Sequence, residues 1–249
     1  MTRLLAAFLA ILALVVSSGA NGAGGPPTLK EKCGDTPGVS TQPFWITTAD
    51  AVRLYAIEVG SGPVGVVLAH ESPANLCGWL PYVPSLTAAG LRVLAFDFRG
   101  FGASVAPRSA AYRAFDRDLA AAVARVRADG ARHVFLMGAS YGGAIALTYA
   151  PRLKLDGVIS LSGEIYLPST KANPFASAPR LRAPLLIVGS RHDRYLPVKD
   201  ALTLLRRAGS KDKRTALYRG GWHGWGIVED APYAAHARAL ILSWIRARS

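Results

Sequence analysis

The feature that most constrains this chain is a regular alternation of short apolar runs with longer stretches of helical character. A candidate hairpin comes first, with arms at Phe44–Thr48 and Val52–Val59 around Ala49-Asp50-Ala51. Runs rich in Val, Leu and Ile then recur, as strands buried on both faces of a sheet require. These runs are Val64–Ala69, Leu91–Phe96, His133–Met137, Leu155–Leu161, Pro184–Val188 and Thr215–Tyr218.

Helix-like stretches separate these runs. They are Trp79–Ala89, Tyr112–Ala128, Tyr141–Ala150, Val198–Arg207 and Pro232–Arg246. Alternation of this kind predicts an α/β fold: a mostly parallel, twisted sheet of about eight strands with helices on both faces and the hairpin at an antiparallel edge. With 51% apolar and 18% charged residues, the chain is not of the disordered class.

The first twenty residues have the pattern of a targeting segment. Arg3 precedes thirteen apolar residues, Leu4–Val16, and the small residues Ser18-Gly19-Ala20 follow. This order predicts a secretory signal peptide over residues 1–20, cleaved from a secreted or periplasmic protein. The alternative is a permanent anchor, but thirteen residues are short for a bilayer core of about 30 Å.

After the signal peptide we expect a linker or N-terminal segment over residues 21–43 and a single folded domain over residues 44–249. The chain has two cysteines, Cys33 and Cys77. In an exported protein an even pair predicts a disulfide, here one that ties the N-terminal segment to a loop after the third strand. The alternative is two unpaired buried thiols.

The run at residues 133–137 leads into Gly138-Ala139-Ser140-Tyr141-Gly142, a Gly-x-Ser-x-Gly sequence directly before a helix. Glycines on both sides allow a sharp strand-to-helix turn that exposes the serine hydroxyl at the carboxyl edge of the sheet. The motif alone has little specificity. Its position between strand and helix makes Ser140 the candidate nucleophile.

An activated serine needs a base within hydrogen-bond reach and an acid that orients the base. Asp193 lies in the loop that leaves the run Pro184–Val188, and His223 lies among glycines after the last strand run. We therefore expect Ser140, Asp193 and His223 to form a catalytic triad. Glu164, at a strand end, is the reserve candidate for the acid.

From about Phe44 to the C-terminus the chain resembles the α/β-hydrolase superfamily. Residues Val66–Pro73 are similar to the family's His-Gly-x-Pro oxyanion loop, and Asp97–Ser104 is similar to its D-x-R-G-x-G-x-S segment. The resemblance implies a serine hydrolase whose oxyanion hole is formed by the backbone N–H groups of Ser72 and Tyr141. A serine nucleophile, not an aspartate, argues against the dehalogenase and epoxide hydrolase members.

One residue departs from the family pattern, because Glu71 stands where glycine is usual. A carboxylate beside an oxyanion hole opposes the developing negative charge unless it points away or pairs. A cationic group on the substrate is another partner that Glu71 could serve.

The remaining histidines are expected to be structural or exposed. His70 is interpreted as a packed residue of the oxyanion loop, and His192 as pointing away from its neighbour Asp193. His133 is expected at a strand entry and His236 on a helix surface. Asp97 and Arg99 are expected to be structural, and Trp222 and Trp225 to be core residues or substrate contacts.

The predicted substrate is a small-molecule carboxylic ester with a small or exposed acyl group. Only 17 residues, Leu167–Ala183, occupy the place where members of the superfamily insert a lid, so we expect no large cap domain and an open site. No cofactor and no metal are expected, since the sequence has no Walker A segment and no zinc-ligand spacing. Two alternatives stay open: an exported acyltransferase with the same triad, and a non-catalytic binding protein on a hydrolase scaffold.

The net charge of +13, from 29 Lys and Arg against 16 Asp and Glu, permits an anionic partner. The basic residues are spread over separate elements and lack the interleaved aromatic residues that stack on bases. We expect no nucleic-acid partner, weak electrostatic association with an anionic surface at most, and a monomer.

Overall fold

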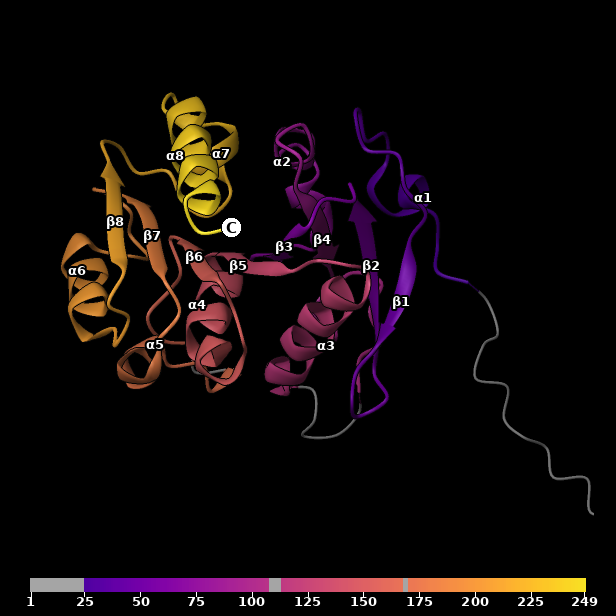
Figure 1. Ribbon diagram of the computed structural model, residues 1–249, viewed down its shortest axis with the longest axis horizontal. Helices are drawn as coiled ribbons and strands as arrows, with labels where there is room; N and C mark the ends of the chain where they lie inside the picture. Colours follow the sequence, from indigo (N-terminus) through magenta and orange to yellow (C-terminus); the bar gives the residue numbers. More distant parts are fainter. Residues whose placement is uncertain (1–24, 108–112, 168–169) are drawn as a thin grey trace, which may run out of the picture.

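The computed structural model describes residues 25–107, 113–167 and 170–249, and its centre is one eight-stranded sheet (Figure 1). The strands are β1 Phe44–Thr47, β2 Arg53–Val59, β3 Val64–Ala69, β4 Arg92–Phe96, β5 His133–Ala139, β6 Gly157–Leu161, β7 Leu185–Ser190 and β8 Lys213–Tyr218. Their order is β1-β2-β4-β3-β5-β6-β7-β8. This arrangement confirms the predicted α/β fold.

The strands from β4 to β8 run parallel, and β2 runs antiparallel to both of its neighbours. The hairpin forms as predicted, with Thr47 opposite Arg53 across the turn. In β4, β6 and β7 every residue is buried, which explains their mostly apolar sequences. In the edge strand β8 all residues are partly or fully exposed, so it accommodates lysine and arginine.

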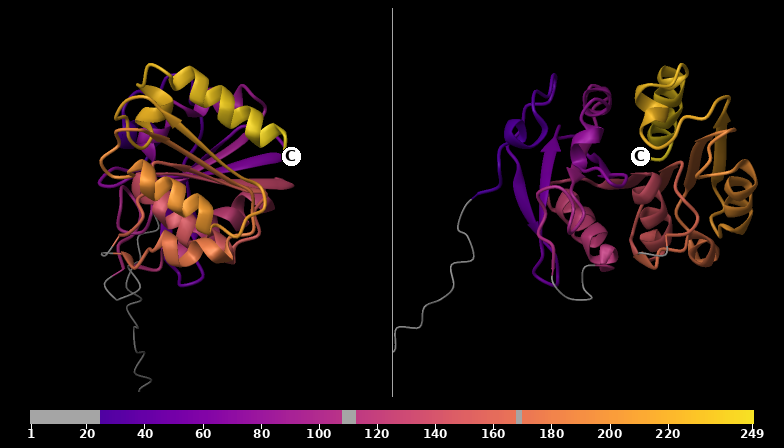
Figure 2. Two further views of the ribbon diagram at one scale, coloured as in Figure 1. Left: turned by 90° about the vertical axis from the view of Figure 1, so that its left-hand side faces the viewer. Right: turned by 180° about the vertical axis from the view of Figure 1, so that it is seen from behind.

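Helices cover both faces of the sheet (Figures 1 and 2). One face carries α3 Phe115–Ala128, α4 Ser140–Tyr149, α5 Pro174–Ser177 and α6 Val198–Arg207. The other carries α1 Leu29–Cys33, α2 Val83–Thr87, α7 Gly226–Glu229 and α8 Ala234–Arg246. Short 3₁₀ turns are η1 Leu76–Trp79, η3 Ala150–Arg152 and η5 Ala178–Arg180.

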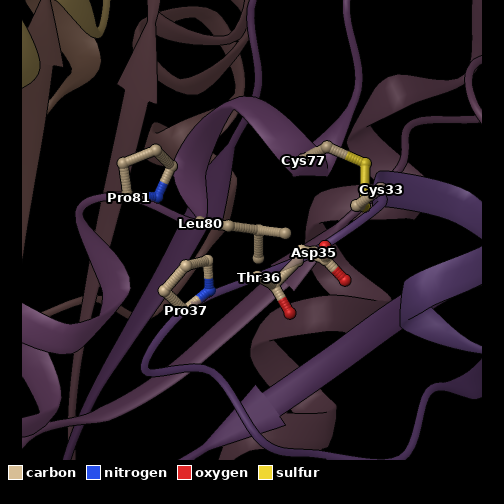
Figure 3. A pocket seen from close by; sticks show the side chains of 7 residues that line it. All are labelled: Cys33, Asp35, Thr36, Pro37, Cys77, Leu80 and Pro81. Carbon is tan, nitrogen blue, oxygen red and sulfur yellow. A yellow bond between two sulfur atoms is a disulfide. The ribbon is translucent and has the colours of Figure 1, made fainter.

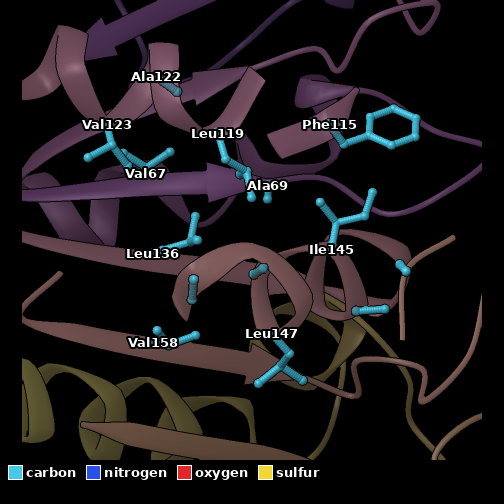
Figure 4. Packing of buried hydrophobic residues seen from close by; sticks show 14 of the residues in the cluster. Val67, Ala69, Phe115, Leu119, Ala122, Val123, Leu136, Ile145, Leu147 and Val158 are labelled. Carbon is cyan, nitrogen blue, oxygen red and sulfur yellow. The ribbon is translucent and has the colours of Figure 1, made fainter. Parts of the chain in front are cut away.

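Each face of the sheet has its own apolar core. On the α3 and α4 face, side chains of the central strands such as Val67, Leu136 and Val158 meet Leu119 of α3 and Ile145 of α4 (Figure 4). All five are fully buried. Burying a side chain of this size stabilises the fold by about 1.5–3 kcal/mol, so the two cores hold the sheet that carries the site.

The helix expected over residues 79–89 forms in a different way. The structure has the 3₁₀ turn η1 followed by the five-residue helix α2. Pro81 and Pro84 explain the break, since proline lacks the N–H that an uninterrupted helix requires. Sequence reasoning also missed α1, although Thr28 and Glu31 form a reciprocal capping box at its start.

A disulfide joins Cys33, at the end of α1, to Cys77 in η1, as predicted. It attaches the N-terminal segment to the loop that follows β3. A surface pocket lies beside it, lined by the two cysteines and by Asp35, Thr36, Pro37, Leu80 and Pro81 (Figure 3). None of these residues belongs to the candidate site.

The predicted signal peptide, residues 1–20, lies outside the described residues. In the part of the chain that is described, no helix combines the length and apolar character that a membrane crossing needs. Among the described residues, the segment between β6 and β7 has only the four-residue helix α5 and the 3₁₀ turn η5 as helical elements, and no large cap covers the sheet.

Buried polar residues anchor the loop that follows β4. The carboxylate of Asp97 accepts hydrogen bonds from Leu76 N and Ala103 N, at 2.8 and 2.7 Å. Arg99, whose side chain is fully buried, pairs with Asp50 and Asp118. The sequence interpretation of Asp97 and Arg99 as structural residues agrees with these contacts.

Candidate active site

Ser140 lies at a sharp turn between β5 and α4. Its φ of +46° is in the left-handed region that residues other than glycine rarely adopt, so the surrounding structure holds the backbone in a strained conformation. Gly142 makes the turn possible, because a Cβ there would overlap the carbonyl oxygens of Ala69 and His70. The end of β3 therefore lies directly against the first turn of α4.

His223 is in hydrogen-bond contact with the serine. Its Nε2 is 2.7 Å from Ser140 Oγ, although the two residues are 83 positions apart in the chain. The Nδ1 of His223 is 2.9 Å from the carboxylate of Asp193. Because a carboxylate only accepts, Nδ1 carries the ring proton and Nε2 is left to accept the serine proton.

Asp193 is fixed in place and ionised. Its side chain is 1% exposed, and its Oδ1 also accepts from the N–H groups of Tyr195 and Leu196 at 2.8 and 3.3 Å. Burial opposes ionisation of the carboxyl, but the hydrogen bonds from His223 and Tyr195 outweigh it, so the pKa of Asp193 lies below its usual value. The histidine thus has a stable anionic partner.

The two residues expected at the oxyanion hole follow the ends of neighbouring strands. Ser72 comes three residues after β3 and Tyr141 two residues after β5, and these strands pair in parallel with Ala69 opposite Gly138. Within the described residues the N–H of Ser72 makes no hydrogen bond. A donor at this edge of the sheet is available to a substrate oxygen.

His70 is a packed residue, as interpreted from the sequence. It is fully buried, its Nδ1 donates to the carbonyl oxygen of Glu71 at 2.8 Å, and its Nε2 accepts from Phe98 N at 3.0 Å. Burial lowers the pKa of His70 to about 4, against the opposing effect of the Glu71 carbonyl, so the ring stays neutral. A neutral ring whose two nitrogens both make hydrogen bonds holds the loop before Ser72 in place.

Glu71 pairs with the histidine loop. Its Oε2 accepts from Trp225 N at 3.2 Å, and the carboxylate lies against Gly224, whose φ of +56° and lack of a Cβ leave room for it. Burial raises the pKa of Glu71, partly offset by the Trp225 hydrogen bond and the charge of His223. The residue that departs from the family pattern therefore connects the loop after β3 to the loop that carries the histidine.

Glu164 does not take the place of Asp193. It follows β6, and its Oε1 lies 3.3 Å from Ser140 Oγ, so it contacts the nucleophile, whereas Asp193 contacts the Nδ1 of His223. His192 is exposed and makes no side-chain hydrogen bond within the described residues, which agrees with its exclusion as the base. His133 enters β5 and His236 is exposed on α8, as expected.

Sequence reasoning missed one ring beside the site and left the role of two others open. The ring of Tyr195 lies on that of His223, with centroids 4.6 Å apart, and the only sequence signal was its position two residues after Asp193. Trp225 packs edge-on against Trp79 and belongs partly to the core. Trp222 is 39% exposed beside the histidine.

Among the described residues, no group of three or more His, Cys, Asp or Glu side chains is arranged to hold a metal ion. The side chains of Asp193, His223 and Ser140 are arranged for proton transfer, as an acid, a base and a hydroxyl in a continuous hydrogen-bonded line. A line of this kind raises the nucleophilicity of a serine hydroxyl.

Comparison of the sequence with family models gives two adjoining matches. The model of the α/β hydrolase fold matches residues 66–180, which include Ser140, and a serine aminopeptidase model matches residues 170–227, which include Asp193 and His223.

Curated relatives match over parts of the chain. Epoxide hydrolase A of Mycobacterium tuberculosis is 32% identical over 139 residues, which are 55% of this chain and 42% of that protein. The bifunctional epoxide hydrolase 2 of Rattus norvegicus is 40% identical over 63 residues, 25% of this chain and 11% of that protein. The chain thus spans less than half the length of these two relatives.

Solved structures share the fold at low sequence identity. An esterase of Pyrococcus furiosus superposes with a TM-score of 0.74 and 17% identity, covering 90% of this chain and 97% of that one. A monoacylglycerol lipase of Paleococcus ferrophilus has a TM-score of 0.67 and 20% identity, covering 79% and 99%. The sheet order, the serine turn, the two family models that together match residues 66–227 and these superpositions show that the chain has the α/β-hydrolase fold.

Proposed function

We propose that this protein is an exported serine hydrolase that cleaves carboxylic esters through a covalent acyl-enzyme. One observation carries the proposal: Ser140, on a strained strand-to-helix turn, is 2.7 Å from a histidine that is in turn 2.9 Å from a buried carboxylate. The chain order of serine, acid and histidine is the order of the triad in this fold.

The geometry suggests how each proton moves. As Ser140 Oγ attacks the ester carbonyl carbon, His223 Nε2 accepts the serine proton and Asp193 stabilises the imidazolium that forms. The N–H groups of Ser72 and Tyr141 stabilise the carbonyl oxygen as it becomes negative. His223 then gives its proton to the leaving alcohol, and a water molecule activated in the same way releases the acid and regenerates the serine.

A serine nucleophile favours esters over the epoxides named for the curated relatives. Attack of Ser140 on an epoxide carbon would leave an alkyl ether, which has no carbonyl group for water to attack. Attack on an ester leaves an acyl-enzyme whose carbonyl remains open to hydrolysis. The same triad would therefore turn over repeatedly on an ester, whereas on an epoxide it would stop after a single alkylation of Ser140.

A small or exposed acyl group fits the site, because no large cap covers the sheet among the described residues. Three exposed aromatic side chains each lie within two residues of a site residue: Tyr166 after Glu164, Tyr195 after Asp193 and Trp222 before His223. Their exposed fractions are 57%, 54% and 39%. Exposed rings at these positions would offer apolar contact area to a substrate.

The proposal of export has support from two features outside the triad. The first twenty residues have the composition of a signal peptide, and the Cys33–Cys77 disulfide suits an oxidising compartment. We propose that the mature protein acts outside the cytoplasm.

The test is a panel of p-nitrophenyl esters of increasing acyl length, assayed with the wild-type protein and with Ser140→Ala. We expect turnover that is highest for the shorter acyl chains and that falls at least 10³-fold in the variant, with nearly unchanged thermal stability. Residual activity above one part in a thousand would contradict Ser140 as the nucleophile. Preferred transfer of the acyl group to an added alcohol would show an acyltransferase instead.

A further inference from the structure

Glu164 is a carboxylate in contact with the nucleophile that ester hydrolysis does not use. Its Oε1 is 3.3 Å from Ser140 Oγ, while the serine's only proton is directed toward His223 Nε2 at the shorter distance of 2.7 Å. Within the described residues Glu164 takes part in no ion pair. The acid that orients His223 is already supplied by Asp193.

A negative charge at this position works against ester cleavage unless something neutralises it. The attack of Ser140 on a carbonyl group creates an anionic oxygen bonded to the same carbon as Oγ, and a nearby carboxylate repels that charge. Glu71, the other carboxylate of the neighbourhood, is engaged with Trp225 N. Glu164 has no comparable backbone donor in the described part of the chain.

We propose that Glu164 binds a cationic group on the acyl side of the substrate, so that the preferred substrates are esters of α-amino acids. This inference rests on the proposed function, since it assumes that Ser140 forms an acyl-enzyme. The substrate's α-ammonium group donates to Glu164 and neutralises the carboxylate at the moment when the negative oxygen forms.

The distances fit an ammonium group on the α-carbon. The α-nitrogen of an aminoacyl group lies about 2.5 Å from the carbonyl carbon, because two bonds of about 1.5 Å join them. That carbon must come within about 3–3.5 Å of Ser140 Oγ before attack. An α-ammonium therefore reaches the region next to Oγ that Glu164 Oε1 faces at 3.3 Å.

The experiment compares two nearly isosteric esters within one enzyme. Alanine benzyl ester carries the α-ammonium group, and benzyl 2-methylpropanoate has a methyl group in its place. Release of benzyl alcohol is followed by chromatography at pH 6.5, where an α-amino group with a pKa of about 7.7–8.0 is charged. The quantity of interest is the ratio of the two kcat/KM values, because damage to the shared machinery cancels in it.

We expect the wild-type protein to prefer the alanine ester by roughly 10- to 100-fold, the effect of one charge-assisted hydrogen bond. Glu164→Gln should bring the ratio close to one, and Glu164→Asp should keep part of it. Asp212→Asn, which removes an exposed carboxylate outside the site, is the matched control and should keep the whole preference. The wild-type preference should also decline above pH 8 as the substrate amine loses its proton.

The inference is overturned if the wild-type ratio is near one, or if Glu164→Gln leaves the ratio unchanged. A choline ester tested alongside carries its cation on the alcohol side. The inference is also overturned if the wild-type protein has a higher kcat/KM on this choline ester than on benzyl 2-methylpropanoate but shows no preference for the alanine ester. These results differ from a failure of the proposed function, in which neither benzyl ester is cleaved and a fluorophosphonate does not label Ser140. Labelling of Ser140 in Glu164→Gln verifies that the variant is folded.

Discussion

Replacing Asp193 with asparagine changes one atom of the acid and reverses the proton pattern of the histidine. The asparagine amide donates toward His223 Nδ1, where the carboxylate accepted at 2.9 Å. The imidazole then carries its proton on Nε2, the atom that is 2.7 Å from Ser140 Oγ. A protonated Nε2 cannot accept the serine proton, so the general base is lost.

The size of the effect follows from the distance between the charges. The imidazolium formed during attack is 2.9 Å from the Asp193 carboxylate, whose side chain is 1% exposed. At an effective dielectric constant of about 20, unit charges at that distance attract by about 6 kcal/mol. Losing that attraction in the transition state lowers the rate by about four orders of magnitude.

The assay is kcat/KM on a short-chain p-nitrophenyl ester for the wild type, for Asp193→Asn and for the control Asp212→Asn. We expect a loss of about 10⁴-fold in Asp193→Asn, a melting temperature near that of the wild type, and no change in the control. A loss of less than tenfold in folded Asp193→Asn would refute the assignment of the acid. A far larger loss in Glu164→Gln than in Asp193→Asn would move the acid to the end of β6.

Three further predictions concern the parts of the fold that hold the site. Gly142→Ala should lower stability by about 1–3 kcal/mol and turnover by about 10²-fold, because the new Cβ overlaps the carbonyl oxygen of Ala69; a wild-type melting temperature and rate would contradict this. Burial, with the nearby acidic charges, raises the pKa of Glu229 to about 8, so the folded protein keeps a proton that the unfolded chain releases above about 4.5. The free energy of unfolding should therefore fall as the pH rises from 4.5 to 8. Glu229→Gln should be as stable as the wild type at pH 4.5 but more stable by about 2 kcal/mol at pH 8.5, and thermal melts at both pH values test this. Replacing Cys33 and Cys77 by serine opens a loop with a sequence separation of 44 and should cost about 4 kcal/mol in urea unfolding, a result that an unchanged midpoint would exclude.

The strands were predictable because burial on both faces leaves few choices of residue. Val64–Ala69 has the same bounds in the sequence prediction and in β3, and the other buried runs differ by a few residues at their ends. The edges of the fold were harder to predict. Helix α1 has five residues and α7 has four, too few to establish a hydrophobic period, so their formation depends on tertiary contacts.

The triad candidates were predictable because each follows a strand at the carboxyl edge of the sheet. The direction of a side chain was not predictable, since it depends on how loops far apart in sequence meet. Glu71 illustrates this limit: the sequence gives its position beside the oxyanion loop, but its contact with Trp225 N spans 154 residues. The contact between Glu164 and Ser140, 24 residues apart, depends on the exit angle of β6 in the same way.

The central claim is that Ser140 is activated by the folded arrangement of His223 and Asp193. Its most direct test is reaction with a fluorophosphonate, followed by intact-mass measurement and peptide mapping. We expect one adduct per folded chain, located on Ser140, and none in Ser140→Ala or in urea-unfolded protein. Absence of an adduct on the folded protein, or an adduct on another serine, would contradict the claim.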